Sequence, residues 1–186
     1  MFERYTEKTR RVIFLARFFA CESGSGSIEP EHILLAIMRE EPDLFRPWLK
    51  SEDDYQTLRT KIQAPEQGKE KIPESANMSF SGPSKQVLGY AAEEAERQNN
   101  THVLPSHFLA ALLRMPDTVA ARALAAMGVR IQEVRMVFVA SLKQPATQRP
   151  ETEELHRLID QLPGSKLEQA REMLEALRES CEKPTA

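Results

Sequence analysis

The stretch Ile28-Glu-Pro-Glu-His-Ile-Leu-Leu-Ala-Ile-Met-Arg39 decides the fold, because a relative of it returns as Val103-Leu-Pro-Ser-His-Phe-Leu-Ala-Ala-Leu-Leu-Arg114. Proline, histidine, leucine, alanine and arginine recur in the same order, and His32 and His107 stand 75 positions apart (107 − 32). The other pairs have the same separation, so the two stretches align without a gap. Repetition at a fixed period predicts two copies of one structural unit.

Length and composition predict a soluble globular protein. The chain has 186 residues, of which 41% are hydrophobic, and a formal net charge of −3. It contains no apolar run of about 18 residues that would suggest a membrane helix, and residues 1–8 lack the plan of a secretory signal. We therefore expect a cytoplasmic protein with no membrane contact, and the slightly acidic balance argues against a nucleic-acid partner.

Apolar residues recur at helical spacing through the first copy, residues 1–63. Helices are predicted at 6–23, 30–40, 44–49 and 55–62. Thr6 is expected to cap the first helix and Pro30 to begin the second, whereas Pro47 is unfavourable inside the third. Trp48, the only tryptophan, is expected to pack in the fold, with contact to a partner protein as the alternative.

The second copy, residues 80–143, follows a proline-containing polar linker at 64–79. Ser81 takes the cap position of Thr6, and two helices are predicted after Arg114, at 117–127 and 131–142. Gly128 between them suits the left-handed position after a helix end. The predicted fold class is therefore all-α, with two pseudo-symmetric four-helix repeats.

A C-terminal extension, residues 151–186, follows a polar connector at 144–150. Leucine-rich stripes on otherwise acidic segments predict a hairpin of two helices, at 151–162 and 165–181. Such a hairpin needs a partner for its apolar stripe, which could be the repeats, another protein, or a second copy in a homodimer formed through residues 151–181.

Sequence motifs of catalysis and of cofactor binding are absent. We find no phosphate loop, dinucleotide fingerprint, HExxH or nucleophile elbow, and Cys21 and Cys181 form no CxxC pair. Because His32 and His107 occupy equivalent positions, they are expected to have a repeated structural role, such as a hydrogen bond that caps a turn. Pro30 and Pro105 are likewise expected to be structural, as the residues that start the two helices. We expect no enzymatic activity, no cofactor and no bound metal.

Three segments resemble a known family: Tyr5-Thr-Glu-Lys-Thr-Arg-Arg-Val-Ile13, Glu31-His-Ile-Leu-Leu-Ala-Ile37 and Asp117-Thr-Val-Ala-Ala-Arg-Ala-Leu124. They are similar to the N-terminal repeat domain of the Clp (Hsp100) unfoldases, nearest to that of ClpC, over roughly residues 1–143. In that family two four-helix units form an all-α domain that docks adaptors and substrates and is followed by ATPase modules. The resemblance implies a free-standing Clp N-domain without those modules.

The resemblance also implies candidate binding residues. ClpC N-domains can recognise phosphoarginine through the cap threonine and the glutamate before the motif histidine, which here are Thr6 and Glu31 in the first repeat. The second repeat has Ser81 and Ser106 instead, so the carboxylate is missing. A helix N-terminus with a hydroxyl suits a phosphate, and a carboxylate suits a guanidinium. In the alternative interpretation these residues are only helix caps and a dipole partner.

Three functional hypotheses follow. The leading one is a non-catalytic adaptor or accessory subunit of a Clp chaperone-protease, whose partners are Clp ATPase or protease subunits, adaptor proteins or substrate polypeptides. The second is a reader of phosphoarginine or another degradation signal. The third is a dimeric scaffold or regulator outside proteolysis.

Overall fold

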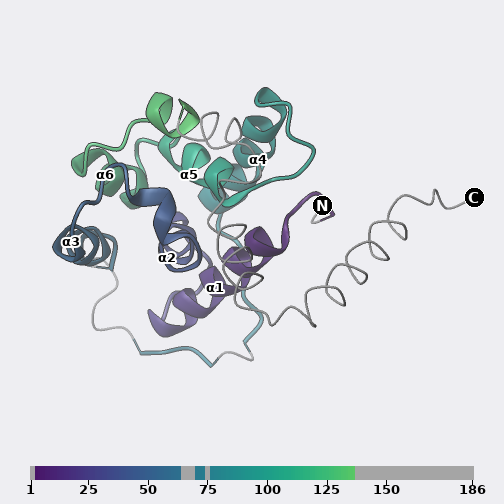
Figure 1. The fold of residues 1–186 in the computed structure, drawn as a ribbon. Helices are drawn as coiled ribbons and strands as arrows, with labels where there is room; N and C mark the ends of the chain where they lie inside the picture. The colour runs from purple at the N-terminus through teal and green to yellow at the C-terminus, as the bar shows by residue number, and fades with distance from the viewer. Residues whose placement is uncertain (1–2, 64–69, 74–75, 137–186) are drawn as a thin grey trace, which may run out of the picture. The chain divides into compact units, whose positions relative to one another are not determined.

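The computed structural model describes residues 3–63, 70–73 and 76–136 of the chain. This part is all-helical apart from two isolated backbone bridges (Figure 1). Its elements are α1 (Glu7–Glu22), α2 (Pro30–Glu40), the 3-10 helix η1 (Pro42–Phe45), α3 (Glu52–Gln63), α4 (Gly82–Arg97), α5 (Pro105–Leu113), α6 (Val119–Ala126) and a helical segment at 131–136. The predicted connector and C-terminal hairpin lie outside the described residues.

Hydroxyl side chains start α1, α4 and α6, because they accept a backbone N–H that the first turn leaves unpaired. The bonds are Thr6 Oγ1 with the N–H of Thr9 (3.3 Å), Ser81 Oγ with that of Ser84 (3.2 Å) and Thr118 Oγ1 with that of Ala121 (3.2 Å). Gly128 has a φ of 78° after α6, the left-handed conformation that glycine adopts at low cost. The predicted caps at Thr6 and Ser81 and the helix end at Gly128 are thus confirmed.

The two proline-led helices, α2 and α5, form the centre of the core. Eight of the eleven residues of α2 and eight of the nine residues of α5 are buried, so these helices are covered nearly all round. α2 packs on α1, α5 packs on α4, and α2 and α5 pack on each other (Figure 1). The repeated stretch that begins each of these helices therefore supplies the interior of the domain.

The third element differs between the repeats, and the predicted helix at 44–49 is wrong. The structure has the short 3-10 helix η1 followed by a turn, whereas the equivalent part of the second repeat is the α-helix α6. Pro47 stands at the position of Arg122, 75 residues later, and proline inside a helix removes a hydrogen bond and clashes with the preceding turn. The first repeat thus contains three α-helices and one 3-10 helix.

The start of α3 also differs from its prediction. The helix begins at Glu52 rather than near Tyr55, so the acidic residues 52–54 form its first turn. Ser51 Oγ accepts the N–H of Asp54 (3.2 Å), and the Asp54 carboxylate accepts the N–H of Ser51 (3.0 Å). This reciprocal pair is a capping box, and carboxylates are favourable at the positive end of a helix dipole.

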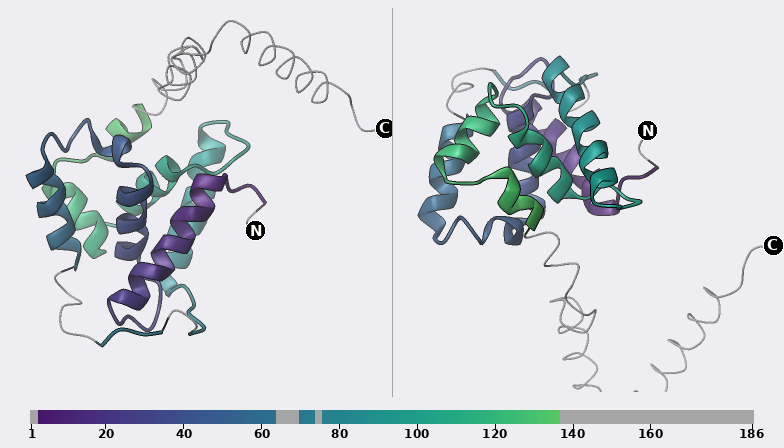
Figure 2. Two further views of the ribbon diagram at one scale, coloured as in Figure 1. Left: turned by 60° about the horizontal axis from the view of Figure 1, so that its bottom comes forward. Right: turned by 90° about the horizontal axis from the view of Figure 1, so that it is seen from above.

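Two isolated parallel bridges join the repeats in a reciprocal way. Figure 2 shows the helices of both repeats from two further sides. Tyr5 pairs with Val103, and Phe80 pairs with Ile28. Adding 75 to the positions of one bridge gives Phe80 for Tyr5 and Val103 for Ile28, so each bridge is the symmetry mate of the other. The residues that lead into the first helix of each repeat are therefore paired with the loop before the second helix of the other repeat.

Part of the predicted linker is fixed to the first repeat. The N–H of Ile72 donates to the carbonyl of Cys21 at 2.9 Å, and Lys71 forms an ion pair with Glu22 at 2.6 Å. The backbone of residues 70–73 thus follows the end of α1. Among the described helices, none is long and apolar enough to cross a membrane.

Candidate binding sites at the helix N-termini

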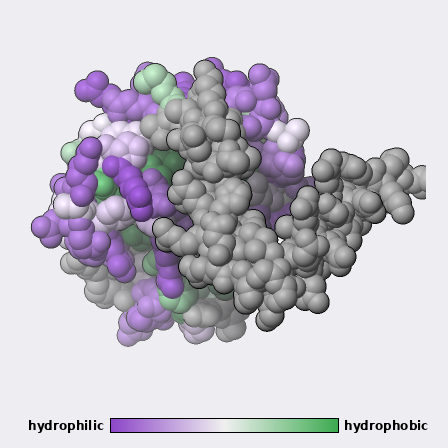
Figure 3. Space-filling model, in the orientation of Figure 1, coloured by the Kyte–Doolittle hydropathy of each residue, from purple (hydrophilic) through white to green (hydrophobic). Residues whose placement is uncertain are grey.

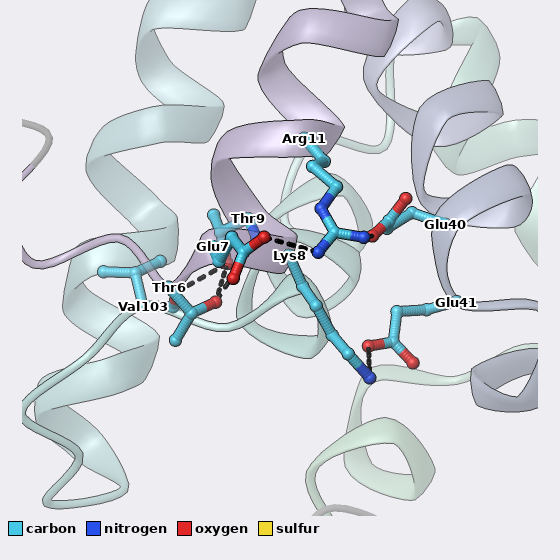
Figure 4. A network of polar contacts seen from close by, with 8 residues as sticks. All are labelled: Thr6, Glu7, Lys8, Thr9, Arg11, Glu40, Glu41 and Val103. Carbon is cyan, nitrogen blue, oxygen red and sulfur yellow. Dashed lines mark hydrogen bonds and ion pairs between the residues drawn. The ribbon is translucent and has the colours of Figure 1, made fainter.

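Thr6 and Glu31, the two candidate residues of the first repeat, lie at opposite ends of an antiparallel helix pair. Ion pairs of Lys8 with Glu41 (3.0 Å) and of Arg11 with Glu40 (3.3 Å) hold the start of α1 beside the end of α2 (Figure 4). Glu31 is in the first turn of α2, about 14 Å along the helix from Glu40 at a rise of about 1.5 Å per residue. These two side chains do not belong to one site.

The bridges between the repeats bring each cap residue close to a candidate residue of the other repeat. The N–H of Ser81 donates to the carbonyl of Ile28 at 3.1 Å, which sets the start of α4 beside the segment that leads to Glu31. In the same way the N–H of Thr6 approaches the carbonyl of Val103 at 3.4 Å, beside the segment that leads to Ser106. Each candidate site is therefore composite, with a cap hydroxyl from one repeat and the residue before the motif histidine from the other.

A chain of hydroxyl groups ties α1 to the second repeat at the Thr6 site (Figure 4). The Thr9 hydroxyl donates to the buried carbonyl of Val103 at 2.7 Å, and its oxygen lies 2.8 Å from the Thr6 hydroxyl. Because the Thr9 proton is used on Val103, the Thr6 hydroxyl is the donor between the two threonines. The Thr6 hydroxyl therefore already has structural partners in both directions.

Two hydroxyls near these sites lack a partner within the described residues. Ser84 is the counterpart of Thr9 and Ser106 that of Glu31, and both hydroxyl oxygens are buried without a hydrogen bond. Ser106 is 8% exposed, whereas Glu31 is half-buried. The Ser81–Glu31 pairing thus offers a helix N-terminus with a carboxylate nearby, and the Thr6–Ser106 pairing offers hydroxyls alone.

The motif histidines make the same backbone contact in both repeats. Nδ1 of His32 accepts the N–H of Glu29 at 2.9 Å, and Nδ1 of His107 accepts the N–H of Leu104 at 3.0 Å. A neutral ring that accepts at Nδ1 carries its proton on Nε2, which lies 3.0 Å from the Ser23 hydroxyl in the first repeat. Both rings are fully buried and occupy the N3 position where a capping box has glutamate or glutamine.

Burial lowers the pKa of His107 to about 4, and the nearby Glu94 carboxylate opposes this shift only in part. Nε2 of His107 lies 3.1 Å from the Asn100 side-chain amide. A ring that stays neutral near pH 7 keeps its accepting Nδ1, so the helix start it caps is stable at that pH.

Trp48 contacts the second repeat directly. Its indole N–H donates to the Glu133 carboxylate at 2.7 Å, and the side chain is half-buried. Trp48 therefore links the turn after η1 to the segment 131–136, and its packing role is supported by this bond.

Glu94 is a buried charge that the sequence analysis missed. It is 0% exposed and forms a two-point ion pair with Arg135, at 2.6 Å and 2.8 Å, with Arg114 at 3.3 Å. Burial raises the pKa of Glu94, but the hydrogen bond and charge of Arg135, with Arg114 and Arg97, outweigh it and hold the pKa below its usual value. The sequence did contain a signal for this buried charge. Glu94 falls in the apolar stripe of α4, at the position that Phe19 occupies in the first repeat.

Within the described part of the chain, no group of three or more histidine, cysteine, aspartate or glutamate side chains could hold a metal ion. The polar side chains identified above cap helices, join the repeats or form ion pairs. The arrangement can bind a ligand at a helix N-terminus or a protein on its surface. The described residues thus form a helical domain of two related repeats.

Comparison with known proteins identifies the family. The model of the Clp repeat (R) N-terminal domain matches the chain twice, at residues 4–88 and 79–173, so the chain belongs to this family. The predicted all-α fold and the resemblance to Clp N-domains are confirmed. The Clp N-domain is a non-catalytic binding fold.

Relatives include both chaperones and an uncharacterized protein. Chaperone protein ClpC2 of Oryza sativa is 32% identical over 74% of this chain, and Negative regulator of genetic competence ClpC/MecB of Bacillus subtilis is 30% identical over 73%. An uncharacterized protein of Mycobacterium tuberculosis is 32% identical over 62% of this chain. The chain spans 16% of the length of each of the two Clp proteins and 45% of the mycobacterial protein.

Solved structures share the fold at low sequence identity. The N-terminal domain of the chaperone ClpD from Arabidopsis thaliana has a TM-score of 0.59 and 22% identity, covering 77% of this chain and 97% of that one. The Hsp104 N-terminal domain from Candida albicans has a TM-score of 0.59 and 19% identity, covering 79% of this chain and 95% of that one.

Proposed function

We propose that this chain is a non-catalytic interaction module that serves as an adaptor or accessory subunit of a Clp chaperone-protease in the cytoplasm. Its partners are Clp ATPase or protease subunits, adaptor proteins or substrate polypeptides. The observation that carries the proposal is the doubled Clp repeat, matched over residues 4–88 and 79–173 and shared with the ClpC chaperones.

The arrangement of the two repeats supports a docking role. The reciprocal bridges and the shared core of α2 and α5 give one body with two related surfaces. A rigid body of this kind can present fixed surface side chains to a partner at low entropic cost.

Capture on the tagged full-length chain tests this proposal. At physiological salt, it should retain a Clp ATPase or protease subunit from the cytoplasm of the source organism, identified by mass spectrometry. Leu34→Asp, which places a charge at a fully buried position of α2, is the unfolded control and should retain neither. Repeated recovery of neither subunit on the native chain contradicts the proposal.

A second candidate function is recognition of a phosphoarginine mark at the Ser81–Glu31 site. It is favoured by the Phe80–Ile28 bridge, which sets the N-terminus of the 16-residue helix α4 beside the segment leading to the Glu31 carboxylate. Amide N–H groups and the helix dipole suit the phosphate, and the carboxylate suits the guanidinium. Ser106 removes the carboxylate from the equivalent site, so one site per chain is expected.

Calorimetry with free phosphoarginine tests this second function. The native chain should bind one equivalent, and Glu31→Gln should abolish the binding because the guanidinium loses its charge partner. Ser106→Glu restores a carboxylate at the equivalent position and should raise the stoichiometry to two. Unchanged binding by Glu31→Gln, or no heat of binding at all, contradicts this function.

A further inference from the structure

An exposed aromatic side chain stands on the outer side of α1. Phe14 is 69% exposed, and among the described residues only Met136 is a comparably exposed large hydrophobic. On the face that Figure 3 shows, the described surface is mainly hydrophilic, with smaller apolar areas. Phe18 is one helical turn later on the same side and is half-buried, so the two side chains make an apolar strip along this side of α1.

Two arginines flank this strip. Arg10 is one turn before Phe14 and is exposed, and the Arg39 guanidinium lies 6.0 Å from the centre of the Phe18 ring. Neither forms an ion pair with a carboxylate of the described residues. Arg11 differs, because its charge is shared between Glu7 (2.6 Å) and Glu40 (3.3 Å). The Phe14 face, defined as Arg10, Phe14, Phe18 and Arg39, is thus both apolar and positively charged.

The second repeat provides an internal comparison. Arg114 is the counterpart of Arg39, and it is neutralised by Glu93 at 2.7 Å and by Glu94 at 3.3 Å. It also lies 3.9 Å from the centre of the Tyr90 ring. Glu93 occupies the position of Phe18, and Gly89 that of Phe14. The second repeat therefore satisfies its arginine internally, whereas the first repeat leaves its arginine beside an exposed aromatic strip.

We propose that the Phe14 face docks an acidic peptide segment of a client or adaptor protein, one that carries an aliphatic or aromatic side chain between carboxylates. This inference rests on the proposed function and names the surface and the partner chemistry. Carboxylates of the segment form charge-assisted hydrogen bonds with Arg10 and Arg39, and its apolar side chain covers Phe14. Aromatic residues and arginine are the types enriched where protein interfaces form. A basic segment is repelled by the same arginines.

Fluorescence anisotropy with two synthetic peptides tests the proposal on the full chain. One labelled peptide of about four helical turns has leucines at every third or fourth position with glutamates between them, and the other has lysines in place of the glutamates. The acidic peptide should bind at least about tenfold more tightly than the basic one, and added salt should weaken its binding. Equal binding of the two peptides overturns the proposal.

Surface variants locate the binding. Phe14→Ala and Arg39→Glu should each weaken the acidic peptide by about fivefold or more, because both remove a central contact. Arg10→Glu should do the same, whereas Lys85→Glu, the same charge reversal at the equivalent exposed position of the second repeat, should leave binding unchanged. An equal loss in Arg10→Glu and Lys85→Glu overturns the proposal, since it would indicate a non-specific charge effect.

The same variants separate this inference from the proposed function. If Phe14→Ala captures Clp subunits normally and binds the acidic peptide as the native chain does, the inference is overturned and the proposed function stands. If the native chain captures no Clp subunit while peptide binding depends on Phe14, the proposed function is overturned and the acidic docking surface stands. Melting temperatures equal to that of the native chain show that each variant is folded.

Discussion

At the scale of single residues, Thr9 and Ser84 occupy the same place in the two repeats, but only the Thr9 hydroxyl has a partner. It donates to the carbonyl of Val103 at 2.7 Å, whereas the Ser84 hydroxyl is buried without a hydrogen bond. Leaving a buried polar group unpaired costs about 1–3 kcal/mol. The same substitution type should therefore have opposite effects at the two positions.

Thr9→Val should lower the free energy of unfolding by about 1–2 kcal/mol, because the Val103 carbonyl loses its side-chain donor. Ser84→Ala should be neutral or stabilise the protein by up to about 1 kcal/mol, because it removes a buried hydroxyl that has no partner. Urea denaturation followed by circular dichroism measures both values. A loss at Ser84→Ala as large as that at Thr9→Val would contradict the asymmetry.

His107 should make stability depend on pH in the mildly acidic range. Burial lowers its pKa to about 4 in the folded protein, against about 6.5 in the unfolded chain. Between these values the unfolded chain binds more protons, so stability is present above about pH 6.5 and is lost as the pH falls toward 4. The protein should therefore be about 2 kcal/mol less stable at pH 5 than at pH 7 through this residue alone.

His107→Gln isolates this contribution. Glutamine at N3 can still accept the N–H of Leu104 but does not titrate, so about 2 kcal/mol of the pH dependence should disappear. His102→Gln, at an exposed histidine of the same loop, is the matched control for the loss of a histidine. Chemical denaturation at pH 5 and pH 7 measures the difference, and an unaltered pH dependence in His107→Gln would contradict the assignment.

At the scale of elements, two side-chain contacts hold the segment 131–136 in place, one to α4 of its own repeat and one to the first repeat. Arg135 bonds Glu94 of α4, and Glu133 accepts from Trp48 of the first repeat. Truncating one partner of a buried ion pair leaves the other charge unpaired, which is costly. The pairing of Arg135 with Glu94 is therefore expected to decide whether this segment stays docked.

Arg135→Ala should destabilise the protein by about 2 kcal/mol, because Glu94 then keeps only its longer contacts, with Arg114 at 3.3 Å and Arg97 at 3.9 Å. The emission of Trp48, the only tryptophan, should shift to the red as Glu133 moves away. Arg97→Ala, whose nitrogen is 3.9 Å from Glu94 and whose side chain is exposed, should cost under about 0.5 kcal/mol. Equal losses in the two variants would contradict a special role for Arg135.

The helices and the repeat were predictable because they depend on local patterns. Period, caps and proline positions predicted α1, α2, α4 and α5, and these elements are confirmed. The helix predicted at 44–49 was wrong, because its apolar residues favoured a helix that Pro47 does not allow. The burial of Glu94 could not be predicted from local sequence, because it depends on an ion pair with Arg135, which lies 41 positions away.

The grouping of the candidate site residues could not be read from the sequence. Thr6 and Glu31 appeared to share a site because they belong to one repeat, but α1 and α2 run antiparallel and place them at opposite ends. Only the backbone pairing of Ile28 with Phe80 shows that Ser81 neighbours the Glu31 segment. Pairing between repeats depends on tertiary contacts that no local pattern encodes.

At the scale of the whole domain, the described residues 3–63 and 76–136 should unfold as one cooperative unit rather than repeat by repeat. In each repeat the segment before the first helix pairs with the loop before the second helix of the other repeat. The buried faces of α2 and α5 belong to one core. In repeat proteins that only stack on neighbours, stability is a sum of separable terms, but reciprocal pairing removes that independence. A defect in one repeat should therefore loosen both.

Leu34→Ala tests this coupling by hydrogen exchange with mass spectrometry on the full chain. Leu34 is fully buried in α2, so its truncation should cost about 2–4 kcal/mol. If α2 and α5 unfold together, the protection of both helices should fall by the same free energy. Leu109→Ala, its counterpart 75 positions later in α5, should give the same pattern from the opposite side. Loss of protection confined to the repeat that carries the substitution would show that the repeats unfold separately, and the bridges would then be contacts between independent units.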